Sequence, residues 1–80
     1  MNTVTLKVYE TNEMINTIVA QSKKSHNAIK LAFKRMLEDT NYASMFIIQV
    51  NDNTPLRFER FTGEYWWDFV KRLQTWVDEL

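Results

Sequence analysis

The chain contains no cysteine, and its 80 residues include one glycine, one proline and one histidine. Without cysteine there is no disulfide framework, no cysteine-ligated zinc or iron–sulfur site, and no thiol nucleophile. A phosphate-binding loop and a dinucleotide-binding fingerprint each need several glycines at fixed spacing, so a single glycine excludes both. His26 has basic neighbours and no acidic residue close in sequence, so we expect neither a metal site nor a bound cofactor.

Long hydrophobic runs are also missing. No apolar stretch approaches the ~20 residues needed to span a bilayer. The first residues have neither the basic segment nor the apolar segment of a secretory signal peptide. We therefore expect a cytoplasmic protein that makes no membrane contact. Ten basic and ten acidic residues cancel, so overall charge favours no class of partner.

Hydrophobic residues make up 45% of the chain and aromatic residues 14%, which is enough for the packed core of one domain spanning residues 1–80. Val4, Leu6 and Val8 alternate with polar residues, the pattern of a half-buried strand. The remaining elements expected are a strand at 14–20, a helix capped by Ser22 or Ser25 and running to about residue 37, strands at 45–50 and 56–61 around a turn at 51–55, and a helix at 63–79 capped by Thr62. The predicted fold is α+β, a small antiparallel sheet with two helices in the order ββαββα.

The segment 14–20 has an alternative interpretation. Met14, Ile15 and Ile18 also fit helical spacing, in phase with the helix that follows, which would give the order βαββα. A continuous helix over residues 12–37 would be roughly 40 Å long, whereas the radius of gyration expected for such a chain is about 12 Å. Such a helix would overhang its own core, so we favour a strand at 14–20.

The first helix is predicted to carry a basic face. Its members are Lys23 and Lys24 at the helix start, followed by Lys30, Lys34 and Arg35. Leu31 falls in the middle of this face, as the apolar centre of a small contact surface would. A basic face keeps a helix solvated, and it also suits an acidic protein surface or the phosphates of a nucleic acid.

Two further surfaces are not explained by core packing. Trp67 lies off the apolar stripe of the last helix, which runs from Tyr65 to Leu80, and tryptophan is enriched in binding hot spots. Asp68 and Arg72 have the spacing of a helix-surface ion pair. On the sheet, the alternation that turns Val8 inward turns Tyr9 outward, and Arg57 is expected beside it.

The segment Ile18-Val19-Ala20-Gln21-Ser22, followed by Ser25-x-x-Ala28-Ile29-x-x-Ala32, resembles a pattern found in small phage and mobile-element proteins. Certain small anti-CRISPR proteins and phage inhibitors of host enzymes are similar in layout. The resemblance covers residues 4–61, and the last helix is additional. It implies a stoichiometric inhibitor that occupies a functional surface of a host complex, and it assigns no site residue.

No catalytic constellation is visible in the sequence. Adjacent carboxylates occur only at Glu38-Asp39 and Asp78-Glu79, both at helix ends and without a neighbouring base. We therefore predict a non-enzymatic protein-binding module of the phage-inhibitor kind. The alternative is a small nucleic-acid-binding module that uses the basic face. A third interpretation is a homodimer formed through the aromatic stripe of the last helix.

Overall fold

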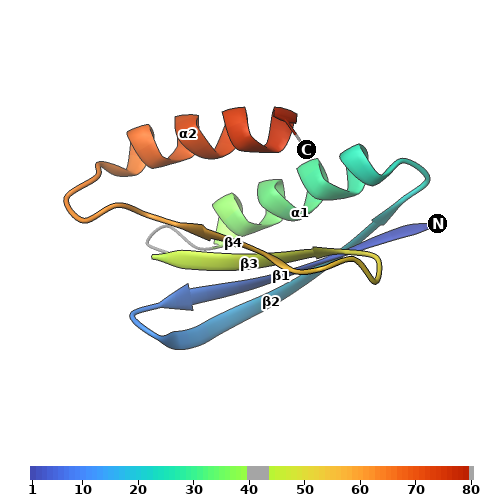
Figure 1. Ribbon diagram of the computed structural model, residues 1–80, viewed down its shortest axis with the longest axis horizontal. Coiled ribbons are helices and arrows are strands. Elements are labelled where there is room, and N and C mark those ends of the chain that lie inside the picture. Colours follow the sequence, from blue (N-terminus) through green and yellow to red (C-terminus); the bar gives the residue numbers. More distant parts are fainter. Residues whose placement is uncertain (40–43, 80) are drawn as a thin grey trace.

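The computed structural model describes residues 1–39 and 44–79, and these form one α+β domain (Figure 1). The elements are β1 (Asn2–Glu10), β2 (Glu13–Ser22), α1 (Ser25–Asp39), β3 (Met45–Val50), β4 (Leu56–Glu59) and α2 (Trp66–Glu79). The predicted order ββαββα is confirmed. Residues 14–20 lie within β2, so the alternative order βαββα is wrong.

The four strands form an antiparallel sheet in the order β2-β1-β3-β4, and both helices lie on the same side of it (Figure 1). The chain therefore builds a hairpin followed by a helix twice, with the first strand of each hairpin at the centre of the sheet. Leu6 is paired with both Ile18 and Ile48, which sets the register of three strands around the core. The opposite side of the sheet, which we call the open face, is covered by no described element.

The β1–β2 hairpin turns through Thr11 and Asn12, both of which have positive φ angles (47° and 64°). Two-residue hairpin turns of this hand match the twist of the strands they join. Just after the turn the register shifts, because Tyr9 pairs with Met14 while Val8 pairs with Asn16. Ile15 is the extra residue of this bulge. The bulge leaves Met14 on the open face beside Tyr9.

The two helices pack on the sheet at different distances. Ala28 and Ala32 are fully buried, and these small side chains allow the backbone of α1 to lie close to β1 and β2. Figure 1 shows α2 further from the sheet. A layer of aromatic rings, Phe46, Phe58, Phe69 and Trp76, fills the space beneath it. Phe33 of α1 reaches the same layer and contacts both Phe46 and Trp76.

The structure fixes where the two helices begin. The first begins at Ser25, one of the two predicted start positions, because β2 continues through Ser22. The second begins at Trp66 rather than residue 63. Gly63 has a φ of 79°, in the left-handed region that a helix excludes, and it belongs to a tight turn in which the Glu64 N–H donates to the Phe61 carbonyl. None of the helices in the described ranges is long and apolar enough to cross a membrane.

The two outer strands are each contacted by an arginine from the helix above them. Arg35 of α1 donates a hydrogen bond of 2.9 Å to the backbone carbonyl of Val19 in β2. Arg72 of α2 donates one of 2.6 Å to the carbonyl of Glu59 in β4. In addition, the N–H of Thr17 in β2 donates a hydrogen bond to the side-chain oxygen of Asn16. Side chains thus satisfy part of the outward backbone of both edge strands.

Candidate functional site: an aromatic surface at the start of α2

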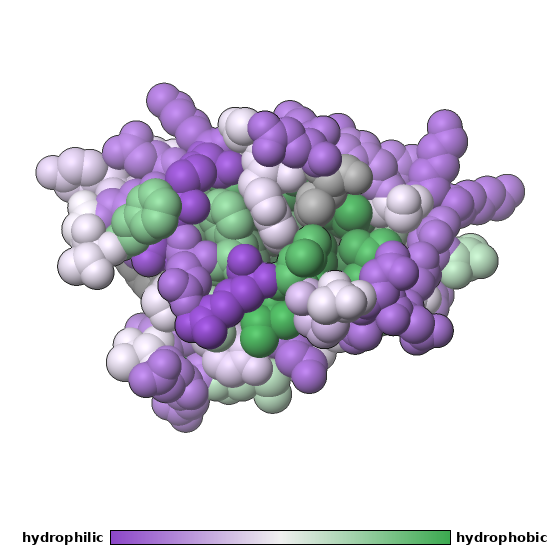
Figure 2. All heavy atoms as spheres, viewed as in Figure 1, coloured by the Kyte–Doolittle hydropathy of each residue, from purple (hydrophilic) through white to green (hydrophobic). Residues whose placement is uncertain are grey.

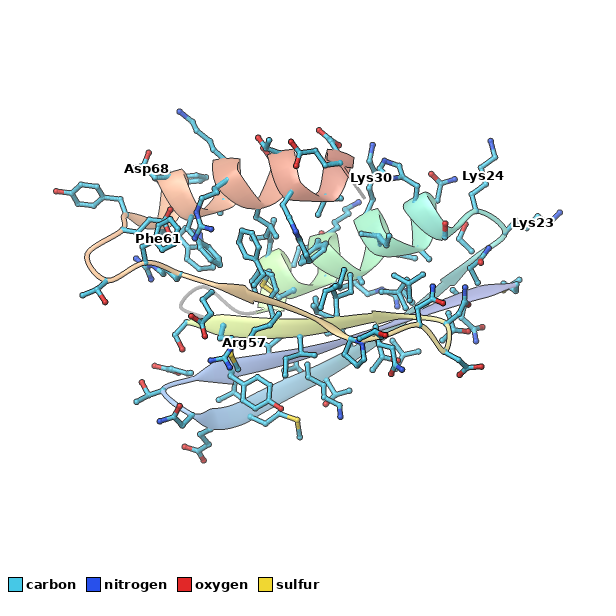
Figure 3. All side chains as sticks on the ribbon, in the orientation of Figure 1. Lys23, Lys24, Lys30, Arg57, Phe61 and Asp68 are labelled. Carbon is cyan, nitrogen blue, oxygen red and sulfur yellow. The ribbon has the colours of Figure 1, made fainter. Side chains whose placement is uncertain are left out.

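Three large aromatic side chains are exposed within seven residues of the β4–α2 connection. Phe61, Tyr65 and Trp67 expose 62%, 79% and 75% of their surfaces. We call this set the aromatic end, since the connection lies at one extreme of the long axis of the molecule, where Phe61 and Asp68 are labelled in Figure 3. Aromatic side chains of this size normally pack in the core or in an interface with a partner, and these three contribute little to the core.

The segment that presents these rings is held by Glu64 and Arg72. The guanidinium of Arg72 donates two parallel hydrogen bonds to the Glu64 carboxylate, from Nε to Oε2 (3.0 Å) and from Nη2 to Oε1 (2.9 Å). The same carboxylate accepts the N–H of Phe61 at 3.1 Å. Arg60 closes the turn by donating twice to the Glu64 carbonyl. Paired bonds of this kind fix geometry as well as adding stability, so the connection is ordered although it has no regular structure.

Arg72 also lies over aromatic rings. Its guanidinium carbon is 3.9 Å from the ring centroid of Phe61 and 4.6 Å from that of Phe58. One face of the Phe61 ring is therefore already in contact, while 62% of the residue remains exposed. The guanidinium carbon of Arg60 lies in the same way over Trp66, 5.7 Å from its ring centroid. Such cation–π contacts hold rings in one orientation in addition to attracting them.

The charge of Glu64 is stabilised in the folded state. Its hydrogen bonds to Arg72 are the main cause of a pKa below the ordinary value of 4.5, and the Phe61 N–H and the nearby positive charges act in the same direction. Partial burial opposes this shift without cancelling it. A lowered pKa in the folded state means that the ionised form contributes to stability.

We expect this contribution to be complete above pH 4.5 and to be lost as the pH falls through the lower, folded-state pKa of Glu64. The Glu64→Gln variant keeps the size of the side chain and removes the charge. Thermal melts followed by circular dichroism from neutral to acidic pH should show wild type more stable at neutral pH and the two proteins converging in acid. A constant difference across the range would contradict the role of the carboxylate.

The basic residues predicted from the sequence do not form a single site with Trp67. Lys23, Lys24 and Lys30 follow one another along the other half of the molecule (Figure 3). Arg35 is exposed, but its guanidinium is bonded to the edge of β2. Leu31 does not stand among the lysines as an exposed contact: it is half-buried and packs against the core.

Of the remaining predicted residues, only Trp67 belongs to the aromatic end. Lys30 and Lys34 flank a groove of about 550 Å³ between the helices, whose far side carries Asp78. Tyr9 is half-buried on the open face, as expected from strand alternation. Arg57 forms an exposed ion pair with Glu59, its neighbour on the same face of β4. Trp67 is exposed, as its position off the stripe predicts.

Sequence reasoning missed Phe61 and Tyr65 of the aromatic end, and it missed the residues that support it, Arg60, Glu64 and Arg72. Tyr65 was expected in the apolar stripe of the last helix, but it precedes the helix and is exposed. Arg72 was expected to pair with Asp68, four residues earlier, and instead bonds Glu64. The glycine at position 63 was the available signal, because a turn there separates Glu64 and Tyr65 from the helix. Leu80, the last residue of the predicted stripe, lies outside the described residues.

The described part of the chain offers no group of three or more histidine, cysteine, aspartate or glutamate side chains that could hold a metal ion. Hydrophilic residues cover the outer sides of the helices, and hydrophobic atoms show between them and the sheet (Figure 2).

No family model, no curated protein and no solved structure matches this chain.

Proposed function

We propose that the protein is a non-enzymatic module that binds another protein through the aromatic end and acts, like a phage-type inhibitor, by covering a functional surface of its partner. The observation that carries this proposal is the exposure of Phe61, Tyr65 and Trp67 on a segment whose backbone is fixed by Glu64 and Arg72. Tyrosine and tryptophan dominate the binding energy of many interfaces.

The rigidity of this segment favours binding. Ordering a flexible loop on association costs free energy for each side chain and backbone unit that is immobilised. Here the turn at 61–64 and the first turn of α2 are in place before any partner arrives. Most of the contact energy of the rings therefore remains available for association.

The nucleic-acid alternative has weaker support. It requires several cations on one surface, because each phosphate contact adds to affinity. Of the five basic residues of the first helix face, Arg35 is bonded to β2, and Lys30 and Lys34 line a groove that Glu38 and Asp78 also line. Lys23 and Lys24 lie exposed ahead of the helix, and they provide the control surface for the test.

The Trp67→Ala variant is expected to lose binding without losing stability. Truncating a hot-spot tryptophan costs at least about 2 kcal/mol of binding free energy, a weakening of roughly thirtyfold. The partner is first captured from an extract of the cells in which the protein acts. It is then purified and titrated calorimetrically against wild type and variant, and the stoichiometry is read from the same titration.

Lys24→Ala is the matched control, since Lys24 is also exposed and lies away from the aromatic end. It should bind the partner as wild type does. Equal affinity of wild type and Trp67→Ala would refute the proposed site. A large fall in melting temperature in Trp67→Ala would show that the ring supports the fold. Loss confined to the Lys24 variant, or capture of nucleic acid alone, would transfer the function to the basic face.

A further inference from the structure

The outer edge of β4 carries backbone groups that the sheet does not use. The Arg60 N–H donates to the Ser44 carbonyl, and this bond continues the ladder between β4 and β3. Because the backbone of an antiparallel strand turns alternately towards and away from its neighbour, Arg57 and Glu59 direct their backbone groups outward. Arg72 occupies the Glu59 carbonyl. No described residue bonds the N–H or the carbonyl of Arg57, so both are available to another strand.

A groove of about 530 Å³ lies beside this edge, lined by Arg57, Phe58, Glu59, Phe61 and Arg72. These residues come from β4, from the connection that forms the aromatic end, and from α2. A chain segment in the groove would therefore lie between an edge strand and a helix, and it would touch the exposed ring of Phe61. Extended peptides bind such edges by adding a strand to the sheet, with main-chain hydrogen bonds supplying affinity.

The side chains of the groove favour a segment that carries a carboxylate. The Arg72 guanidinium donates through Nε and Nη2 to Glu64 and Glu59, and within the described part of the chain no atom accepts a hydrogen bond from Nη1. Since Arg72 lines the groove, Nη1 is the donor that a bound segment can use. A carboxylate forms the strongest hydrogen bond with such a donor. Arg57 contributes its backbone rather than its charge, because its guanidinium is paired with Glu59.

We propose that the partner presents an extended acidic segment, which adds a strand to the four-stranded sheet beside β4. The backbone of this segment pairs with the N–H and the carbonyl of Arg57, a carboxylate of the segment accepts from Arg72, and the rest of the partner covers the aromatic end. This inference rests on the proposed function, since it specifies the chemistry of the partner that binds there. The other edge strand, β2, lies at the opposite side of the sheet, away from the aromatic end.

Proline at position 57 tests the backbone pairing. Arg57→Pro removes the outward N–H and takes no bond from the ladder, because that N–H does not face β3. Arg57→Ala is the matched control, since it also removes the side chain and its ion pair but keeps the N–H. Figure 3 shows this side chain directed away from the helices, so neither variant alters the core.

The probe is a displayed library of random linear dodecapeptides, selected for binding to the wild-type protein. We expect the selected peptides to share an acidic residue and to bind Arg57→Ala as tightly as wild type. Affinity for Arg57→Pro should fall at least about tenfold, because a hydrogen bond is lost and a peptide carbonyl is left unpaired. Replacing the shared acidic residue of the peptide with its amide should weaken binding by a similar factor. In hydrogen exchange followed by NMR, the Arg57 amide should become protected when a peptide binds.

The outcomes separate this inference from the proposed function. Peptides that lose affinity for Trp67→Ala but not for Arg57→Pro would support the aromatic end and overturn strand addition. Equal losses in Arg57→Pro and Arg57→Ala, peptides without a required carboxylate, or no selectable peptide would overturn it as well, and the aromatic end would keep its own calorimetric test. Circular dichroism shows whether Arg57→Pro is folded. If it is not, protection of the Arg57 amide in wild type decides, and unchanged exchange on peptide binding would refute the pairing.

Discussion

Replacing Phe46 with alanine is expected to lower the free energy of unfolding by about 3–5 kcal/mol, a large part of the stability of a domain of this size. Phe46 is fully buried in the central strand β3. Its ring contacts those of Phe33, Phe58 and Phe69, with centroids 5.3, 5.4 and 5.6 Å away. The cavity would open between the sheet and both helices, and the rigid rings around it could not close it.

Chemical denaturation and thermal melting measure this effect. Each kcal/mol shifts the melting temperature of a small domain by roughly 4–8 °C, so we expect a fall of at least about 12 °C. Tyr65→Ala removes a ring of similar size from an exposed position and should change the melting temperature little. Similar losses in the two variants would show that the aromatic layer beneath α2 does not carry the core.

Arg72→Ala should give the second-largest loss of stability, and it should also weaken the proposed binding. The side chain donates a hydrogen bond to the Glu59 carbonyl and lies over Phe58 and Phe61. Hydrogen bonds to charged groups contribute about 1.5–3 kcal/mol each, and we expect a total loss of about 2–3 kcal/mol. Released from the guanidinium, the connection before α2 would become mobile.

Two variants separate the contributions of charge and shape. Arg72→Lys keeps the charge but cannot form the two parallel bonds, so it should restore only part of the stability. Arg57→Ala removes an exposed arginine whose ion pair with Glu59 is open to solvent, and it should have almost no effect. Full stability in Arg72→Lys would mean that positive charge alone supports the connection.

The strands were predictable because their local pattern and their tertiary role agree. Val4, Leu6 and Val8 alternate and are all fully buried. The segment 14–20 was ambiguous in its periodicity, and overall size favoured the strand, because a continuous helix of roughly 40 Å would exceed the longest dimension of the domain, 37 Å. In such a small protein, overall dimensions constrain secondary structure as strongly as local preference does.

The support of the aromatic end was not predictable, because it depends on contacts between elements. Local spacing pairs Arg72 with Asp68, whereas the turn at Gly63 brings Glu64 within reach and a bidentate pair forms there. The partial burial of Leu31 was not predictable for a similar reason. It lies off the apolar face of α1 on a helical wheel, yet it packs against the core. Trp67 was identified correctly as exposed, since a residue opposite the stripe has no core to enter.

The arginines that contact the outer strands affect whether the sheet can add strands from neighbouring molecules. A sheet with free edges can add strands from neighbouring molecules without end, because each addition exposes a new edge. Here Arg35 occupies the Val19 carbonyl and Arg72 the Glu59 carbonyl, and each arginine is carried by the helix packed on that half of the sheet. These contacts form only once the helices have docked, so folding itself shields part of the template for fibre-like addition.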